Sequence, residues 1–219
     1  MITSAILLGC VMAKSTRPTL DHVFSTTCDT PFVYILDSGF DQNGRLSPNP
    51  MTRVQALGYS GKGNPGGYLN LSAKWTGREP FEILGCTSSE FWTMTLTDNH
   101  IASIDFSTDY RKTNPNRLPQ LFLMQGNKTY IAEIPSSSTM VNQWITATKS
   151  LTNTDFIEIR PKGGQVGDRN AASHPDFKTN GQSMHFMVGL DVFKPSKGTE
   201  GTEKLDYDNI NIHVRTVQN

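Results

Sequence analysis

The sequence has no long apolar run and no excess of charge of either sign. Twenty Lys and Arg residues balance twenty Asp and Glu residues, and the basic residues do not gather into a cluster. A neutral chain without a basic patch argues against nucleic acid and anionic membranes as its main partners. A membrane-spanning helix needs about 20 consecutive apolar residues. No stretch of that kind follows the N-terminus, so no integral membrane segment is expected.

Motifs of known catalytic and metal sites are also missing. The five histidines have no HxH or HExxH spacing, the cysteines form no CxxC, and no GxSxG nucleophile motif is present. The glycine-rich stretch 58–67 (GYSGKGNPGG) lacks the GK[ST] and the following helix of a phosphate loop. Glycosidases need a pair of carboxylates, and the glutamates offer candidates that a sequence cannot pair. No catalytic residue is therefore assigned, and an enzyme remains only an alternative.

Cysteine is scarce, and its positions bear on where the protein works. One of the three, Cys10, lies in Met1–Ala13, a short apolar run that ends in small residues. This run resembles a secretory signal peptide or, with Leu7 to Cys10, a lipoprotein signal; an N-terminal strand or a misassigned start are the other interpretations. If Cys10 leaves or is lipidated, Cys28 and Cys86 remain as a disulfide or as two free thiols. A secreted or cell-surface protein is expected.

What the sequence does contain is the pattern of an all-β protein. Gly, Pro, Thr, Ser and Asn are abundant, and the charged fraction of 18% lies below the usual quarter. Alternating or short apolar runs predict strands, with turn-rich stretches between them and no segment of helical period. The strands are expected at 32–36, 68–71, 92–96, 104–106, 121–124, 130–134, 156–160, 184–192 and 205–214. We expect an antiparallel β-sandwich or jelly roll.

The domain limits follow from the same pattern. Residues 14–30 are polar and predict an irregular lead-in, and residues 31–217 predict one domain without internal repeats. The stretches 37–44, 58–67, 165–183 and 194–204 are rich in polar and turn residues and predict loops. Gln125 to Lys128 between two apolar runs predicts a hairpin.

Two motifs near the start and the end of the predicted domain are Gly63-Asn64-Pro65-Gly66-Gly67-Tyr68-Leu69 and Leu205-Asp206-Tyr207-Asp208-Asn209-Ile210. Through them the chain resembles laminin domain IV-like modules and galactose-binding-like carbohydrate-binding modules. Shorter matches are Pro175-Asp176-Phe177 through Met184-His185-Phe186, and Trp144 followed by Leu151. The resemblance spans residues 32–214 and implies a secreted or surface-attached, non-catalytic jelly roll.

The resemblance also implies a structural calcium ion. Related jelly rolls hold Ca²⁺ where the first acidic loop, the glycine entry and the closing strand meet. Here that implies ligation by Asp37 or Asp41, by the Gly66 carbonyl and by Asp208, which are the hard oxygen donors that Ca²⁺ prefers. The alternative is that the acidic residues of the closing segment simply cap a strand.

Glycan binding needs flat aromatic rings beside polar groups, because sugar C–H faces stack on rings while hydroxyls need hydrogen-bond partners. Exposed candidates in or beside polar segments are Tyr59, Trp75, Tyr110, Arg111 and Trp144. Trp92 alternates with apolar residues and is expected in the core. The sequence therefore predicts a non-catalytic extracellular binding or adhesion module for polysaccharide or matrix glycan. A polysaccharide lyase or glycoside hydrolase on the same fold, and a structural domain that contacts other extracellular proteins, are the alternatives.

Overall fold

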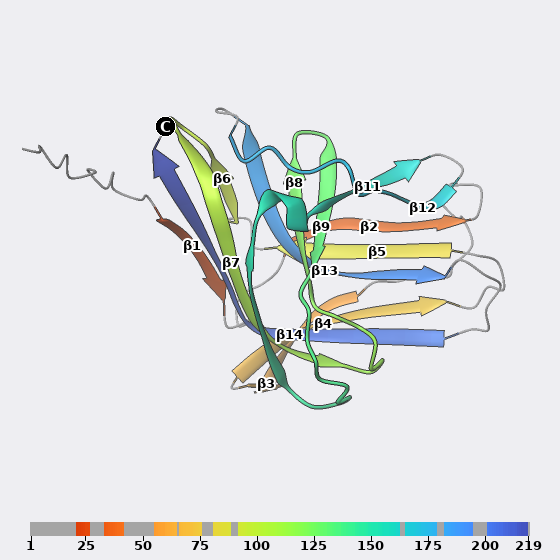
Figure 1. Ribbon diagram of the computed structural model, residues 1–219. Coiled ribbons are helices and arrows are strands. Elements are labelled where there is room, and N and C mark those ends of the chain that lie inside the picture. Colours follow the sequence, from red (N-terminus) through yellow and green to blue (C-terminus); the bar gives the residue numbers. More distant parts are fainter. Residues whose placement is uncertain are drawn as a thin grey trace, which may run out of the picture.

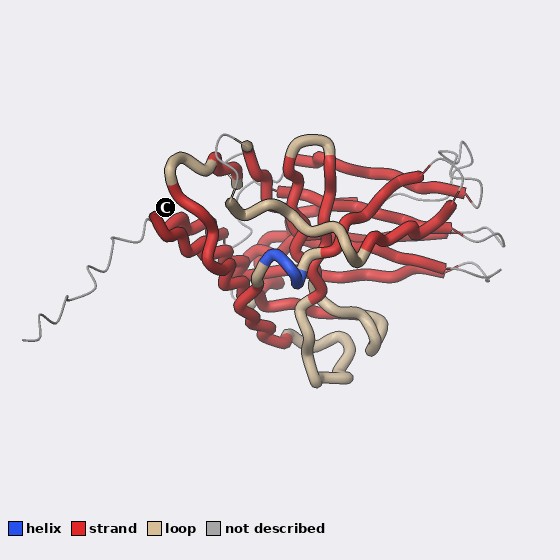
Figure 2. The backbone as a smooth tube through the Cα atoms, turned by 45° about the horizontal axis from the view of Figure 1, so that its top comes forward, coloured by secondary structure: helices blue, strands red, loops and turns tan. Residues whose placement is uncertain are grey.

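The computed structural model describes residues 21–26, 33–41, 55–64, 66–75, 81–88, 92–162, 165–178, 182–194 and 201–218. These residues form fourteen strands and one short 3-10 turn, Asn153–Asp155, so the described part is almost entirely β-structure (Figure 2). It contains no helix of the length and apolar character that crossing a bilayer requires. Met1–Ala13 and Cys28, on which the expectations of a signal and of a disulfide depend, lie outside the described residues.

Six strands form the first sheet, in the antiparallel order β10-β7-β14-β4-β3, with β1 paired to the second half of β14 (Figure 1). Their bounds are β1 Asp21–Thr26, β3 Gln55–Gly63, β4 Gly66–Trp75, β7 Asn99–Lys112, β10 Ile145–Leu151 and β14 Gly201–Gln218. We call this sheet A. Its strands come from both ends and the middle of the chain, so it fastens the termini of the described part together.

The other eight strands form the second sheet, sheet B, in the antiparallel order β12-β11-β9-β8-β13-β5-β2, with β6 paired to β13. Their bounds are β2 Val33–Asp41, β5 Phe81–Ser88, β6 Thr93–Thr95, β8 Gln120–Gln125, β9 Lys128–Glu133, β11 Ile157–Lys162, β12 Gln165–Asn170 and β13 Ser183–Lys194. The predicted β8–β9 hairpin is confirmed, and Gly126 at its turn has a positive φ of 62°.

The closing strand β14 is the longest element and bends in its middle. It pairs with β4 through Gly201–Tyr207 and with β1 through 210–215, and β7 runs beside it at nearly full length. The register along β7 shifts between Asp208 and Asn211, which is a β-bulge, and Asn209 there has φ 47°. Bulges bend a strand and often place one residue in the left-handed region, which Asn tolerates better than most. In Figure 1, β14 accordingly runs along the bottom and then turns up to the C-terminus.

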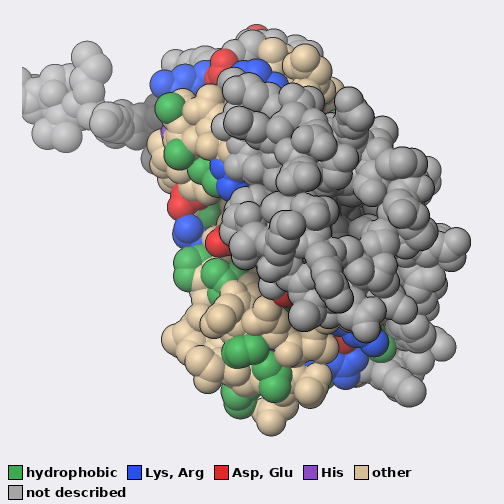
Figure 3. All heavy atoms as spheres, turned by 90° about the vertical axis from the view of Figure 1, so that its right-hand side faces the viewer, with side chains coloured by type: hydrophobic (Ala, Val, Ile, Leu, Met, Phe, Trp, Pro, Cys, Tyr) green, Lys and Arg blue, Asp and Glu red, His purple; other side chains and the backbone are tan. Residues whose placement is uncertain are grey.

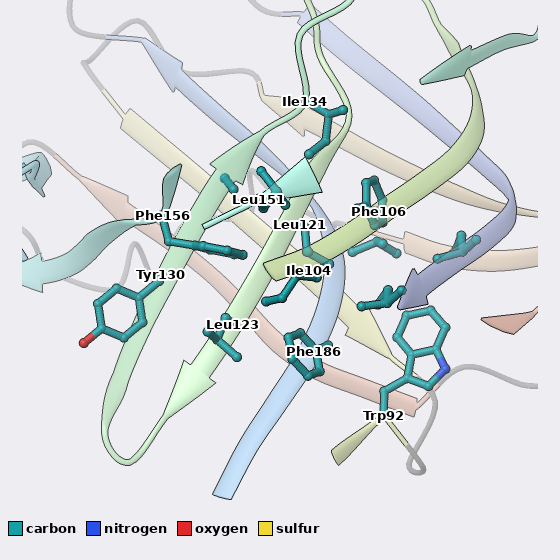
Figure 4. Close-up of a cluster of buried hydrophobic side chains, with 14 of the residues drawn as sticks. Trp92, Ile104, Phe106, Leu121, Leu123, Tyr130, Ile134, Leu151, Phe156 and Phe186 are labelled. Atoms are coloured by element: carbon teal, nitrogen blue, oxygen red, sulfur yellow. The ribbon is translucent and has the colours of Figure 1, made fainter. Parts of the chain in front are cut away.

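The core lies between the two sheets and follows the period of two along each strand. Apolar side chains from β7, β8 and β13 meet there, as Figure 4 shows for Ile104, Phe106, Leu121, Leu123 and Phe186. Tyr207 of β14 spans the core: its hydroxyl donates to the Gly189 carbonyl at 2.7 Å and accepts from the Gln120 amide at 2.9 Å. The expected all-β antiparallel sandwich of the jelly-roll class is confirmed.

Several stretches predicted as loops are strands. Residues 37–41 continue β2, most of the glycine-rich stretch 58–67 pairs as the β3–β4 hairpin, 165–170 form β12, and β14 begins at Gly201. The irregular lead-in 14–30 is also wrong for Asp21–Thr26, which pairs with β14 as β1, so the fold begins before residue 31. These segments lie at sheet edges or strand ends, where backbone pairing does not require the apolar alternation that sequence patterns detect.

Candidate functional site

The outer face of sheet A carries a polar surface that no described element covers. Leu69, Leu71 and Leu205 point into the core, so the residues that alternate with them point outward. The outward residues of β4, β7, β10 and β14 include aromatic, charged and hydroxyl side chains. Thr146, Thr148 and Ser150 of β10 are exposed, whereas Asn70 of β4 and Asp206 and Asp208 of β14 are buried, so the face is most open to solvent along β10.

Arg111 lies at one end of this face and contacts two aromatic rings that also contact each other. Its guanidinium carbon is 4.9 Å from the ring centre of Tyr68 and 4.8 Å from that of Trp144. The two rings meet edge to face, with centres 5.8 Å apart. Asp206 holds the guanidinium from β14, accepting from Nε at 2.8 Å and from Nη2 at 2.7 Å, and Asn70 also donates to Asp206. Cation–π contact and ion pairing therefore fix one orientation of the whole group.

Trp144 sits at the end of a loop that a buried lysine holds in place. Lys112, on the inner face of β7, is 1% exposed, and its Nζ donates to the carbonyls of Pro115 and Ser138 at 2.8 Å each. Its own carbonyl accepts from the Asn142 amide at 2.8 Å. Burial lowers the pKa of the Lys112 ammonium. The loop that carries Trp144 is thus anchored to the strand that carries Arg111.

The next residues along the face form a hydrogen-bonded group around Asp109. This carboxylate accepts from the Thr146 hydroxyl at 2.5 Å, from the Asn209 side chain at 2.7 Å and from the Asn64 side chain at 3.4 Å. Asn209 donates also to the Asn64 carbonyl, which ties the β3–β4 turn to the bulge of β14. The group offers acceptors and amide donors at the surface.

The Asp208 side chain also links the β3–β4 turn to the bulge of β14. It is fully buried, and its two carboxylate oxygens accept from the backbone amides of Asn64 and, at 2.7 Å, Asn209. A Cβ at Gly63 would lie 2.6 Å from the Asp208 carboxylate, so this close approach requires glycine. The glycine-rich motif and the closing motif therefore meet in space.

The remaining predicted calcium ligands lie elsewhere or are not described. Gly66 is in the turn beside Asp208, with φ 95°, whereas Asp37 and Asp41 are on β2 of sheet B, and their side chains are outside the described residues. Within the described part, no group of three or more His, Cys, Asp or Glu side chains could hold a metal ion. The backbone N–H groups that face Asp208 suit a hydrogen-bonded carboxylate. The calcium site stays a prediction.

Of the five predicted ligand-binding residues, the structure brings two together and buries one. Arg111 and Trp144 share the aromatic end of the outer face. Tyr110 was expected to be exposed, which is wrong: it is 0% exposed on the core side of β7, because it alternates with Arg111 along a strand rather than lying in a loop. The backbones of Tyr59 and Trp75 lie on β3 and β4, and their side chains are outside the described residues.

Sequence reasoning missed Tyr68, Asn70 and Asp206 as members of this site. The sequence pattern predicts Tyr68 as a strand residue without a binding role, and Asp206 as part of the acidic closing segment that caps a strand or adjoins the calcium site. The alternation of β4 around its buried leucines marks Tyr68 and Asn70 as outward-facing, which is a usable signal. That Asn70, Asp206 and Arg111 stand directly opposite one another depends on strand register, which the sequence does not show.

The described charges on the surface are mixed in sign. Among the described residues in Figure 3, Lys and Arg side chains lie beside Asp and Glu side chains. This distribution agrees with the balanced composition and gives no footprint for a polyanion.

Comparison with protein-family models gives no match, and comparison with curated proteins gives none either. Among solved structures, the chain is similar to a family 11 carbohydrate-binding module from Clostridium thermocellum in complex with a β-1,3-1,4-mixed-linked tetrasaccharide. The identity is 12% and the TM-score 0.44, over 88% of this chain and 94% of that one. A family 11 module of a cellulosomal cellulase from the same organism gives 15% identity and a TM-score of 0.39, over 81% and 88%. Both are carbohydrate-binding modules, a group that the sequence resemblance named.

Proposed function

We propose that the chain is a non-catalytic glycan-binding module that acts outside the cell, in binding or adhesion to polysaccharide or matrix glycan. The observation that carries the proposal is the group formed by Arg111, Tyr68 and Trp144 on the outer face of sheet A, where Arg111 and Trp144 are half-buried and reach solvent. The half-buried Trp144 ring suits the C–H surface of a pyranose ring, and the half-buried Arg111 guanidinium beside it suits the sugar hydroxyls. Because the ion pair fixes this group before a ligand arrives, little ordering cost remains for binding.

The proposal is tested by a glycan array, with a turnover assay on every glycan that binds. Replacing Trp144 by alanine removes one of the two aromatic rings of the group. We expect the affinity for the glycan to fall at least about tenfold, which corresponds to a loss of about 1.4 kcal/mol of binding free energy. Trp144 is only partly buried, so the melting temperature should change little. Titration calorimetry measures the affinity.

The matched control is Met140→Ala, in the same loop, where the side chain is 49% exposed and lies outside the aromatic group. It should bind like the parent chain. Equal affinity of Trp144→Ala and the parent would remove the basis of the proposed site. Release of product from a bound glycan would show that the chain is an enzyme instead, and failure to bind any glycan would favour a structural domain that contacts other proteins.

A structural calcium ion and secretion belong to the same proposal. The calcium part rests on the resemblance and on the position of the Asp208 carboxylate, which lies against the glycine-rich β3–β4 turn that the resemblance assigns to the ion. At about 100 times its dissociation constant, a bound ion stabilises the folded state by about 2.7 kcal/mol. We therefore expect a chelator to lower the melting temperature by roughly 5–10 °C, and added calcium but not magnesium to restore it. An unchanged melting temperature would count against the ion.

A further inference from the structure

The polar side chains on the outer face of sheet A stand in rows that cross the strands. The antiparallel register pairs outward residues of β10, β7 and β14, and at one end of β4, directly opposite one another. Trp144, just before β10, adjoins the first row through its contact with Arg111. In order along the strands the rows are Arg111-Asp206-Asn70, Thr146-Asp109-Asp208, Thr148-Ser107-Asn211 and Ser150-Asp105-His213. We call these four rows the polar ladder.

The far end of the polar ladder is hollowed. A depression of about 450 Å³ is lined by the side chains of its last two rows, together with the flanking Phe106 and Lys149. The β14 bulge lies at the boundary, where the register shifts between Asp208 and Asn211, so the hollow begins where the strand bends. Thr148 and Ser150 on its rim are exposed. The aromatic group and the depression therefore lie at opposite ends of the polar ladder, and the exposed Thr146 and half-buried Asp109 lie between them.

The length of the polar ladder points to a chain rather than a single sugar. Adjacent rows are two residues apart, which is about 7 Å in an antiparallel strand, so four rows extend over roughly 20 Å. Each row offers hydroxyl, amide or carboxylate groups, the partners that successive sugar hydroxyls need. Each row has at least one exposed or half-buried member, so a ligand that lies along the strands can reach every row, whereas one pyranose ring cannot.

The charges of the polar ladder favour an uncharged ligand. Its half-buried carboxylates are Asp105 and Asp109, and its one full cation, Arg111, is paired with the buried Asp206. Arg215 lies beside the last row and binds Asp105 at 2.6 Å. Hydrogen bonds from Ser150 and Arg215 lower the pKa of the Asp105 carboxyl, so it is ionised at neutral pH. Ionised carboxylates accept from hydroxyls and repel uronates and sulfates.

We infer that the polar ladder and its terminal depression form one extended site for a linear, uncharged polysaccharide. The aromatic group binds one sugar, and the last two rows bind sugars further along the same chain. This inference rests on the proposed function, which concerns the aromatic end alone. It adds the length, the direction and the charge class of the ligand, and a second binding region that the aromatic group does not include.

The test uses a soluble β-glucan and a galactomannan as neutral probes, with polygalacturonate as the charged counterpart. Oligosaccharides from disaccharide to hexasaccharide, cut from the neutral polymer that binds, are then titrated by calorimetry. We expect affinity to rise with length up to at least the tetrasaccharide, and polygalacturonate to bind at least about tenfold more weakly. The double variant Thr148→Ala/Asn211→Ala should lose roughly tenfold in affinity for the hexasaccharide and less than twofold for the disaccharide.

Thr139→Ala, an exposed threonine away from the polar ladder, is the matched control and should not change either affinity. Equal binding of the disaccharide and the hexasaccharide would overturn the extended site, as would an unaffected double variant. In either case a continued effect of Trp144→Ala would leave the proposed function standing. Strong binding of polygalacturonate would overturn the charge class, and absence of binding to every glycan would overturn both the inference and the proposed function.

Discussion

Replacing Arg169 by methionine should lower the free energy of unfolding by about 3–5 kcal/mol at neutral pH, the usual cost of removing one partner of a buried ion pair. Arg169 of β12 pairs with Asp191 of β13, whose side chain is 0% exposed. The second carboxylate oxygen of Asp191 has no hydrogen-bond partner among the described residues. Without Arg169, the carboxylate would remain buried with its charge largely uncompensated. Chemical denaturation of the variant and the parent measures the difference.

The other polar neighbours of Asp191 explain why its carboxylate depends on Arg169. Arg117 donates to the Asp191 carbonyl at 2.5 Å and to the Glu203 carboxylate at 2.9 Å, so it links sheet B to sheet A. The Gln120 side chain accepts from the Asp191 amide at 2.9 Å. Arg117 thus places a positive charge near Asp191, but its N–H groups donate to the Asp191 backbone carbonyl and to Glu203 and not to the Asp191 carboxylate. Arg169 supplies the direct ion pair.

The pH dependence of this effect identifies its cause. Burial raises the pKa of the Asp191 carboxyl above its ordinary value of 3.8, although Arg169 and Arg117 act in the opposite direction. A carboxyl with a raised pKa in the folded state binds more protons there than in the unfolded chain. Between the ordinary and the raised pKa, its contribution to stability therefore increases as the pH falls. Loss of Arg169 raises that pKa further, so the penalty should be largest at neutral pH and shrink on acidification toward pH 4.

Two further variants keep the prediction open to refutation. Arg169→Met/Asp191→Asn removes the buried charge together with its partner and should recover much of the lost stability. Arg169→Lys keeps the charge without the planar donor group and serves if the methionine variant does not fold. A penalty that is independent of pH, or that the double variant does not relieve, would mean that Arg169 acts through packing.

Strand β7 shows most clearly how much of the fold the sequence pattern predicts. The alternation of Ile104 and Phe106 correctly predicts an inner face there, yet the predicted strand ends at Phe106 and leaves Tyr110 and Arg111 in or beside a polar segment. The strand in fact continues to Lys112, with Tyr110 inside and Arg111 outside. A strand whose outer face is solvated contains polar residues at every second position, so polarity alone did not mark its end.

The candidate site shows a second limit of prediction from sequence, which concerns contacts between residues far apart along the chain. The glycine-rich and closing motifs could be expected to meet, because the resemblance placed them together, and Asn64 and Asp208 do so. The contacts among Trp144, Tyr68 and Arg111 depend on the strand order β10-β7-β14-β4 and on its register. Strand order is set by the packing of the whole sandwich, and no local pattern contains it.

The Asp208 side chain contributes both to the fold and to the candidate site. Replacing it by alanine should lower the free energy of unfolding by about 3 kcal/mol. Its carboxylate accepts from the backbone amides of Asn64 and Asn209, so the variant leaves two donors at a partly buried position without an acceptor. For a chain of this length we expect the melting temperature to fall by roughly 6–12 °C. Differential scanning calorimetry measures it.

The comparison variants separate the hydrogen bonds of Asp208 from other causes. Asp208→Asn keeps the shape and one acceptor oxygen, so about half of the loss is expected. Asp21→Asn removes an exposed carboxylate that pairs with His213 at 3.0 Å and should change stability by less than about 1 kcal/mol. Because the hydrogen bonds need no ion, Asp208→Ala should remain less stable than the parent chain when both are measured in chelator. If chelator removes that difference, Asp208 stabilises the fold through a bound cation, and the β3–β4 turn is held to the bulge by the ion rather than by its amides.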